Sequence, residues 1–104
     1  MGAFEGMKVQ QDIVHFLEQG NYYNASISTT NFQDYVHLTD PHTGFIKKKE
    51  FIHVDPVINA KTQYAIFNNI EAGAMYESIK NSYKNGLIYR TEHKGLWGEI
   101  YRLK

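Results

Sequence analysis

The spacing of apolar and polar residues changes near residue 20. Over 7–19, apolar residues recur at helical intervals and polar residues fill the positions between them, which predicts an amphipathic helix with one buried face. Gly20 and Asn21 then indicate a helix stop, because glycine enters the left-handed conformation without a Cβ penalty. We expect residues 1–6 to be disordered or foreign to the natural sequence.

Beyond the stop, the period shortens to two residues, which is typical of half-buried strands. The pattern predicts strands at 22–30, 33–40 and 45–54, the last two joined as a hairpin by the turn sequence of residues 40–44. Asp55-Pro56 should end the third strand, because proline cannot continue the hydrogen-bond ladder.

A short apolar run at 63–67 predicts a fourth strand, and a second helix follows over about 70–84. Asn68 followed three residues later by Glu71 resembles a capping box, and Asn85-Gly86 marks the end of this helix.

The closing stretch alternates again and predicts two strands, 87–92 and 96–103, around the turn His93-Lys94-Gly95. The whole order is α-β-β-β-(β)-α-β-β. We therefore expect residues 1–104 to form a single α+β domain with two helices and a mainly antiparallel sheet of about five to six strands.

Composition narrows the class of protein. The 104 residues have no Cys and a formal net charge of zero, and 42% of them are hydrophobic, as in a folded domain. The missing Cys excludes disulfides, thiolate zinc sites and a cysteine nucleophile. No apolar run is long enough to cross a bilayer, so we expect a soluble, cytoplasmic protein without a membrane partner.

The neutral total hides an uneven distribution of charge. Residues 1–79 carry five Lys against nine acidic residues, a balance of −4, whereas residues 80–104 have a balance of +4. Overall neutrality disfavours a dedicated nucleic-acid binder, since phosphate contacts supply most of the affinity of such proteins. The basic end keeps that function open as an alternative.

The motifs of phosphate loops, dinucleotide sites, zinc proteases and serine hydrolases do not occur in the sequence, and we expect no cofactor. Glu50 and His53 have the spacing of a helical metal pair, but on a strand they point to opposite faces. His53 and Asp55 share a face, and His37 could join them across the hairpin. Polar residues on a wet sheet face explain these positions more simply, and we predict no metal site.

Lys47, Lys48 and Lys49 alternate between the two faces of the third strand, which spoils a cationic patch. Lysines on both faces are typical of an edge strand that avoids pairing with other chains. An edge strand can also accept a strand from a partner, which makes Lys47 and Lys49 candidate contacts.

Aromatic residues make up 14% of the chain. In the closing hairpin, we expect Leu87, Tyr89, Leu96 and Ile100 to face the core. The outward set is then Arg90, Trp97, Glu99 and Tyr101. If Glu92 opposes Gly95, Arg90 lies across from Trp97 as a cation–π pair, with Glu99 diagonal to it.

Two classes of function compete. We expect a non-enzymatic interaction module, such as a regulator, inhibitor or accessory subunit, that binds a protein partner through exposed aromatics and a sheet edge. A homo-oligomer is a further option. Its contacts would be Arg90, Trp97, Glu99, Tyr101, Lys47 and Lys49. The alternative is a nucleic-acid-binding domain that uses helix 70–84 and hairpin 86–104, with phosphate contacts from Lys80, Lys84, Arg90, Lys94 and Arg102. A metal-independent nuclease built on His37 or His53 is a third option.

Overall fold

The computed structural model of the chain describes residues 2–29, 46, 51–68 and 73–104. The described part contains two α-helices, a short 3₁₀ turn and five strands. In chain order these are α1 (Gly2–Gln19), η1 (Tyr22–Asn24), β1 (Ile27–Thr29), β2 (Val54–Asp55), β3 (Tyr64–Asn68), α3 (Gly73–Ser82), β4 (Leu87–His93) and β5 (Leu96–Arg102). The predicted α+β class is confirmed.

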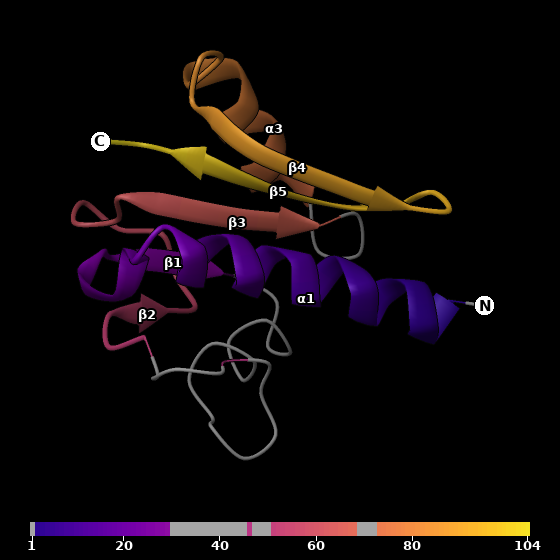
Figure 1. The fold of residues 1–104 in the computed structure, drawn as a ribbon. Helices are drawn as coiled ribbons and strands as arrows, with labels where there is room; N and C mark the ends of the chain where they lie inside the picture. The colour runs from indigo at the N-terminus through magenta and orange to yellow at the C-terminus, as the bar shows by residue number, and fades with distance from the viewer. Residues whose placement is uncertain (1, 30–45, 47–50, 69–72) are drawn as a thin grey trace.

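The helices lie on opposite faces of one sheet, so the molecule has three layers (Figure 1). Successive residues of β3 pack on opposite faces of the sheet. Ile66 packs with residues of α1, whereas Ala65 and Phe67 pack with residues of α3. Because side chains of a strand alternate between faces, a sheet covered on both sides needs apolar residues in succession, and β3 has them.

The sheet is mixed, and the prediction of a mainly antiparallel sheet is wrong. Its strand order is β2-β1-β3-β5-β4, in which β1 runs parallel to both β2 and β3, while β5 runs antiparallel to β3 and β4. Parallel neighbours need a crossover of a dozen or more residues, and residues 30–63 supply that length between β1 and β3. Our expectation of hairpin neighbours assumed shorter connections.

Helix α1 begins at Gly2, earlier than the predicted start at residue 7, and ends at Gln19 as expected. The residue that enters the left-handed region is Asn21, with φ 58°, and not Gly20. Glycine is needed at position 20 for space, because a Cβ there would lie 2.3 Å from the ring of Tyr22. The stop was predicted correctly, but the role of its glycine was not.

The first described strand is shorter than the sequence pattern suggested. Tyr22–Asn24 form a 3₁₀ turn, and within the described residues 22–29 only Ile27–Thr29 belong to a strand. Of the predicted strand 45–54, residues 51–53 do not belong to a strand and Val54 belongs to β2, which ends at Asp55 as expected. The predicted strand 33–40, the turn at 40–44 and the lysines 47–49 lie outside the described residues.

The core between α1 and the sheet is mainly apolar, although the buried carboxylate of Glu18 accepts a hydrogen bond from the hydroxyl of Tyr23 at 3.2 Å. Ile13, Leu17 and Ile100 are at most 2% exposed, and they belong to one cluster that also takes in Tyr23 and Phe51. The helix packs tightly against β5 at Gly98, where an added Cβ would lie 2.8 Å from Cγ1 of Val9. Glycine at this position therefore sets how deeply α1 sits on the sheet.

Helix α3 covers the opposite face with Tyr76 and Ile79, which pack against Ala65, Phe67 and Tyr101. Its described part, Gly73–Ser82, lies within the predicted helix 70–84. Asn68, predicted as the cap of this helix, is instead the last residue of β3, and Glu71 lies outside the described residues.

Candidate functional site

Among the described strands, the sheet ends on one side at β4, a seven-residue strand whose hairpin partner is β5. The two strands turn through Lys94 and Gly95, with φ of 52° and 88°. Positive φ at both central residues is the mark of a type I′ turn, whose twist suits a two-residue hairpin. The predicted hairpin is confirmed, with a turn one residue shorter than expected.

The register differs by two residues from the one we expected, because the two residues enclosed by the closing pair are Lys94 and Gly95, whereas a Glu92–Gly95 pair would enclose His93 and Lys94. Arg90 lies opposite Glu99, and Glu92 lies opposite Trp97. Because a shift of two keeps every side chain on its predicted face, Arg90 still reaches Trp97 diagonally, with the guanidinium carbon 5.3 Å from the ring centroid. The predicted cation–π pair is therefore present in a different register.

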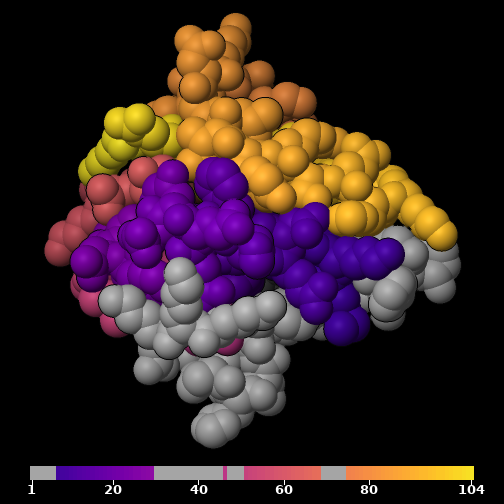
Figure 2. All heavy atoms as spheres, in the orientation of Figure 1, coloured from indigo at the N-terminus to yellow at the C-terminus, as the bar shows by residue number. Residues whose placement is uncertain are grey.

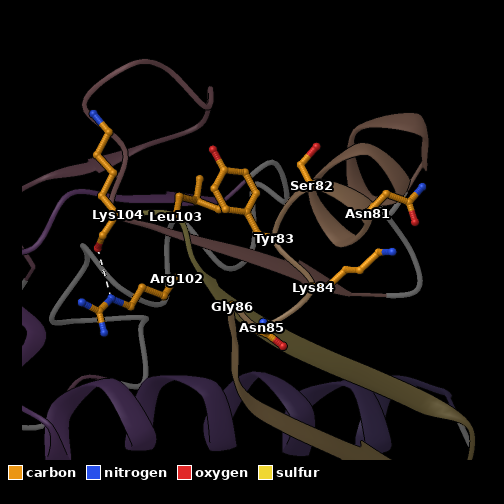
Figure 3. A pocket seen from close by; sticks show the side chains of 9 residues that line it. All are labelled: Asn81, Ser82, Tyr83, Lys84, Asn85, Gly86, Arg102, Leu103 and Lys104. Atoms are coloured by element: carbon orange, nitrogen blue, oxygen red, sulfur yellow. Dashed lines mark hydrogen bonds between the residues drawn. The ribbon is translucent and has the colours of Figure 1, made fainter.

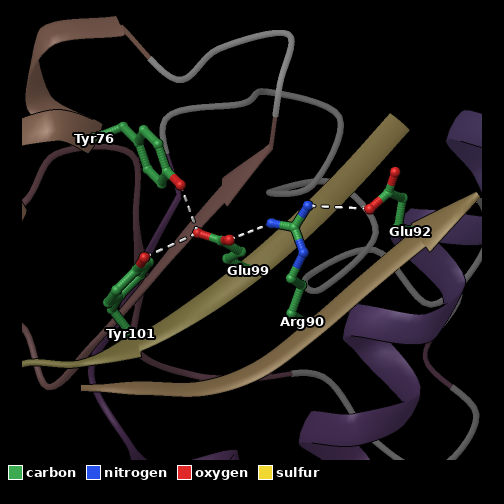
Figure 4. A network of polar contacts seen from close by, with 5 residues as sticks. All are labelled: Tyr76, Arg90, Glu92, Glu99 and Tyr101. Atoms are coloured by element: carbon green, nitrogen blue, oxygen red, sulfur yellow. Dashed lines mark hydrogen bonds and ion pairs between the residues drawn. The ribbon is translucent and has the colours of Figure 1, made fainter. Parts of the chain in front are cut away.

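Glu99 is the centre of a buried polar network (Figure 4). It is 4% exposed, and one carboxylate oxygen accepts hydrogen bonds from the hydroxyls of Tyr76, at 2.8 Å, and Tyr101, at 3.0 Å. Its other oxygen pairs with Arg90, which also bonds Glu92 at 3.1 Å. The carboxylate thus joins α3, β5 and β4.

Burial within this network raises the pKa of both tyrosines, and their hydrogen bonds to the Glu99 carboxylate raise it further. Both effects favour the protonated hydroxyl, because an ionised phenolate would be desolvated beside a carboxylate. The two hydroxyls therefore remain donors to Glu99 at neutral pH.

The expectation that Glu99 and Tyr101 face outward is wrong. Tyr101 is only 3% exposed, since α3 packs over the face that the sequence pattern left open. Trp97 is half-buried beside Tyr76, with ring centroids 5.0 Å apart. Of the outward set, Arg90 keeps the most accessible side chain, at 40%.

A bulge explains the other misplaced residue. Leu87 pairs with Tyr101 and Tyr89 pairs with Ile100, so Ile88 is an extra residue in β4. An extra residue reverses the alternation of the strand beyond it. Leu87 therefore leaves the face of Tyr89 and is 42% exposed, contrary to its predicted place in the core.

The hairpin geometry also fixes which backbone groups face away from the sheet. A two-residue turn is closed by a hydrogen-bonded pair, here His93 and Leu96, and such pairs alternate along an antiparallel ladder. The N–H and C=O groups of Arg90 and Glu92 consequently point away from β5. Figure 2 shows the hairpin open to solvent on this side of the molecule, between α1 and α3.

On its other face, β4 is tied to α1 by a polar cluster that our reading of the sequence missed. One oxygen of Asp12 lies 2.5 Å from the hydroxyl of Thr91 and 2.7 Å from Nε2 of His93. Burial raises the pKa of Asp12, but these hydrogen bonds and the nearby imidazoles of His93 and His15 outweigh it and hold the pKa below 3.8. No local spacing could reveal the cluster, because about eighty positions separate Asp12 from its partners.

Basic residues of the C-terminal region surround a second feature, an open cleft of about 510 Å³ beyond the end of α3 (Figure 3). Lys84, Arg102 and Lys104 line it together with Tyr83. Arg102 donates through Nε to the carbonyl of Lys104 at 3.2 Å. The cleft is polar, with donors from side chains of both the helix end and β5.

The cleft brings together only two of the residues predicted to bind nucleic acid, Lys84 and Arg102. Lys80 lies over the ring of Tyr76, 5.5 Å from its centroid. Arg90 is held by its carboxylates, and Lys94 occupies the turn at the far end of β4. The set does not form one continuous surface.

The structure gives little support to a site built on His37, His53 and Asp55. His53 and Asp55 are exposed, and Asp55 accepts a hydrogen bond from the backbone of Val57 at 2.9 Å, which caps a local turn. His37 and Glu50 lie outside the described residues. Within the described ranges, no three His, Asp or Glu side chains are grouped to hold a metal ion.

Comparison of the chain with protein-family models, curated proteins and solved structures gives no match. In the described part of the chain, neither helix has the length and apolar character needed to span a membrane.

Proposed function

We propose that this chain is a non-enzymatic protein-interaction module that binds an extended segment along the outer edge of β4. The observation that carries the proposal is a seven-residue strand at the end of the sheet, paired on one side with β5 among the described residues. A strand edge offers a row of backbone donors and acceptors that another strand can match.

The edge is held rigid on both faces. Through Arg90 and Glu99 it is linked to Tyr76 of α3, and through Thr91 and His93 it is linked to Asp12 of α1. A strand already fixed in its bound conformation loses little entropy when a partner arrives, which favours association. These contacts suit β4 to act as a preformed template.

The side chains along the edge carry both signs of charge. Arg90 and Glu92 are 40% and 52% exposed at the side chain, and Leu87 adds an exposed apolar residue at the start of the strand. A segment with alternating charge complements such an edge better than a phosphate backbone does.

Glu92→Pro tests this function directly. Proline removes the N–H that points away from β5, so it should block strand addition and leave the β4–β5 ladder intact. We expect the immobilised wild-type protein and Glu92→Ala to retain a partner from lysate of the source cell, and Glu92→Pro to lose it while keeping the wild-type circular dichroism. Equal retention by wild type and Glu92→Pro would contradict the proposal.

Nucleic-acid binding is the second candidate, favoured by the cleft of Lys84, Arg102 and Lys104. In the same experiment, it would appear as retention that nuclease treatment removes and that Glu92→Pro does not change. Lys84→Glu should then abolish the retention, because the reversed charge repels phosphate.

A further inference from the structure

We infer that the segment bound along β4 is the β4 strand of a second copy of this chain, antiparallel and centred on Thr91. The inference rests on the proposed function, because it uses the same edge. It adds the identity of the partner and the register of the pairing.

The backbone limits the possible registers. Only Arg90 and Glu92 direct both their N–H and C=O groups away from β5 in the regular part of β4, between the bulge at Ile88 and the turn at Lys94. A two-fold axis through Thr91 places Arg90 opposite Glu92 of the second copy. In that pair, the N–H and C=O groups of each residue point toward the other strand, so the two residues can exchange both backbone hydrogen bonds.

Charge then selects among the registers that the backbone allows. An axis through residue 90 would oppose Arg90 to itself, and an axis through residue 92 would oppose Glu92 to itself and Arg90 to Lys94. Like charges directly opposite each other are unfavourable in a sheet, and opposite charges are favourable. The axis through Thr91 is the one that pairs Arg90 with Glu92 on both sides.

The surroundings of β4 agree with this arrangement. Glu92 bonds Arg90 within one chain at 3.1 Å with 52% of its side chain exposed, so Arg90 can keep Glu99 and gain Glu92 of the second copy. A two-fold contact of this kind uses the same patch on both molecules and closes on itself. It yields a dimer whose sheet continues across the axis and does not grow into fibres.

Cysteine cross-linking tests the register, since the chain has no Cys of its own. In the proposed dimer, residue 91 meets itself in a non-hydrogen-bonded pair, with Cα atoms about 4.5 Å apart, within the range of a disulfide. Residue 92 lies two positions along the strand from residue 92 of the second copy. Their Cα atoms are therefore farther apart than the roughly 7 Å that a disulfide can bridge. We expect Thr91→Cys to oxidise to a covalent dimer and the more exposed Glu92→Cys to remain mostly monomeric.

Sedimentation of the protein without added Cys provides a second measurement, free of any change at Thr91. Wild type should show a concentration-dependent dimer, and Glu92→Lys should weaken it by about tenfold or more, because it places like charges opposite each other on both sides of the axis. Glu92→Pro should leave a monomer.

The results of these experiments distinguish a failure of the self-pairing from a failure of the proposed function. A monomeric wild type, or equal cross-linking at positions 91 and 92, overturns the self-pairing even if Glu92→Pro still abolishes retention of another protein. A dimer that Glu92→Pro and Glu92→Lys leave intact uses a different surface and also overturns it. If Glu92→Pro changes neither dimer nor retention, the proposed function fails with it.

Discussion

The two faces of the sheet are both buried, but they are buried by different chemistry. Beneath α1, Ile13, Leu17 and Ile100 belong to the larger apolar cluster, where the hydrogen bond from Tyr23 to the buried Glu18 is a minor part. Beneath α3, the smaller cluster of Tyr76, Ile79 and Tyr101 encloses the carboxylate of Glu99. The first face contributes most of the hydrophobic free energy of folding and holds β4 through the partly exposed Asp12, whereas the second holds β4 through Arg90 and the buried Glu99.

This difference teaches how the candidate edge is supported. An apolar cluster tolerates small shifts of its members, whereas a buried carboxylate needs its donors in place because an unsatisfied charge is costly in the interior. Arg90 satisfies Glu99 from the edge strand itself. A substitution in β4 should therefore disturb the hydrogen bonds of Glu99, and a substitution at Glu99 should disturb β4.

The largest expected effect is on the apolar face. Leu17→Ala should lower the free energy of unfolding by about 2–5 kcal/mol, because Leu17 is fully buried and its removal leaves a cavity. Ile79→Ala, a matched change under α3 at 7% exposure, should cost less. Urea denaturation measures both. A larger loss for Ile79→Ala would reverse the assignment of the main core.

A smaller effect is expected when the network loses its cation. Arg90→Ala should lower the free energy of unfolding by about 1–3 kcal/mol, toward the lower end because the arginine is 40% exposed. Adding Glu99→Gln to Arg90→Ala should recover part of the lost free energy of unfolding, because the uncompensated charge of Glu99 is then removed. Lys84→Ala, which removes an exposed cation outside the network, serves as the control, and all variants are compared at concentrations where wild type is monomeric. Strict additivity of the two changes would show that Arg90 and Glu99 are not coupled.

The smallest expected effect concerns the link between α1 and β4. The pKa of Asp12 is lowered in the folded state, so its contribution to stability is present above 3.8, the ordinary value, and is lost as the pH falls below it. Thr91→Val removes one hydrogen bond to the carboxylate and should raise the pKa of Asp12 toward that value, with a loss in stability at neutral pH of less than about 1 kcal/mol. The carboxyl carbon shift in an NMR titration reports the pKa. An unchanged pKa would show that Thr91 does not bond Asp12 in solution.

Local patterns predicted the elements whose signals are local. The apolar period of residues 7–19, the run at 63–67 and the alternation on both sides of Lys94-Gly95 each correspond to an element of the structure. Helical spacing and strand alternation depend only on neighbours in sequence, so no knowledge of the fold is needed to recognise them.

The faces of the hairpin could not be predicted in the same way. Alternation separates Tyr101 from Ile100, but it does not say which side another helix will cover, and α3 covers the side of Tyr101. The bulge at Ile88, which exposes Leu87, likewise depends on how β4 meets β5. Both errors arose because burial is decided by contacts between segments distant in sequence.

The sequence by itself determined the α+β class, the two helices and the closing hairpin, because periodicity and turn residues act over a few positions. Tertiary structure alone decided the parallel pairing of β1, the burial of Glu99 beneath α3 and the meeting of Asp12 with Thr91 and His93. It also placed β4 at one edge of the described sheet. Strand order and the covering of faces follow from how the whole chain minimises exposed apolar surface and unsatisfied polar groups, which no local pattern encodes.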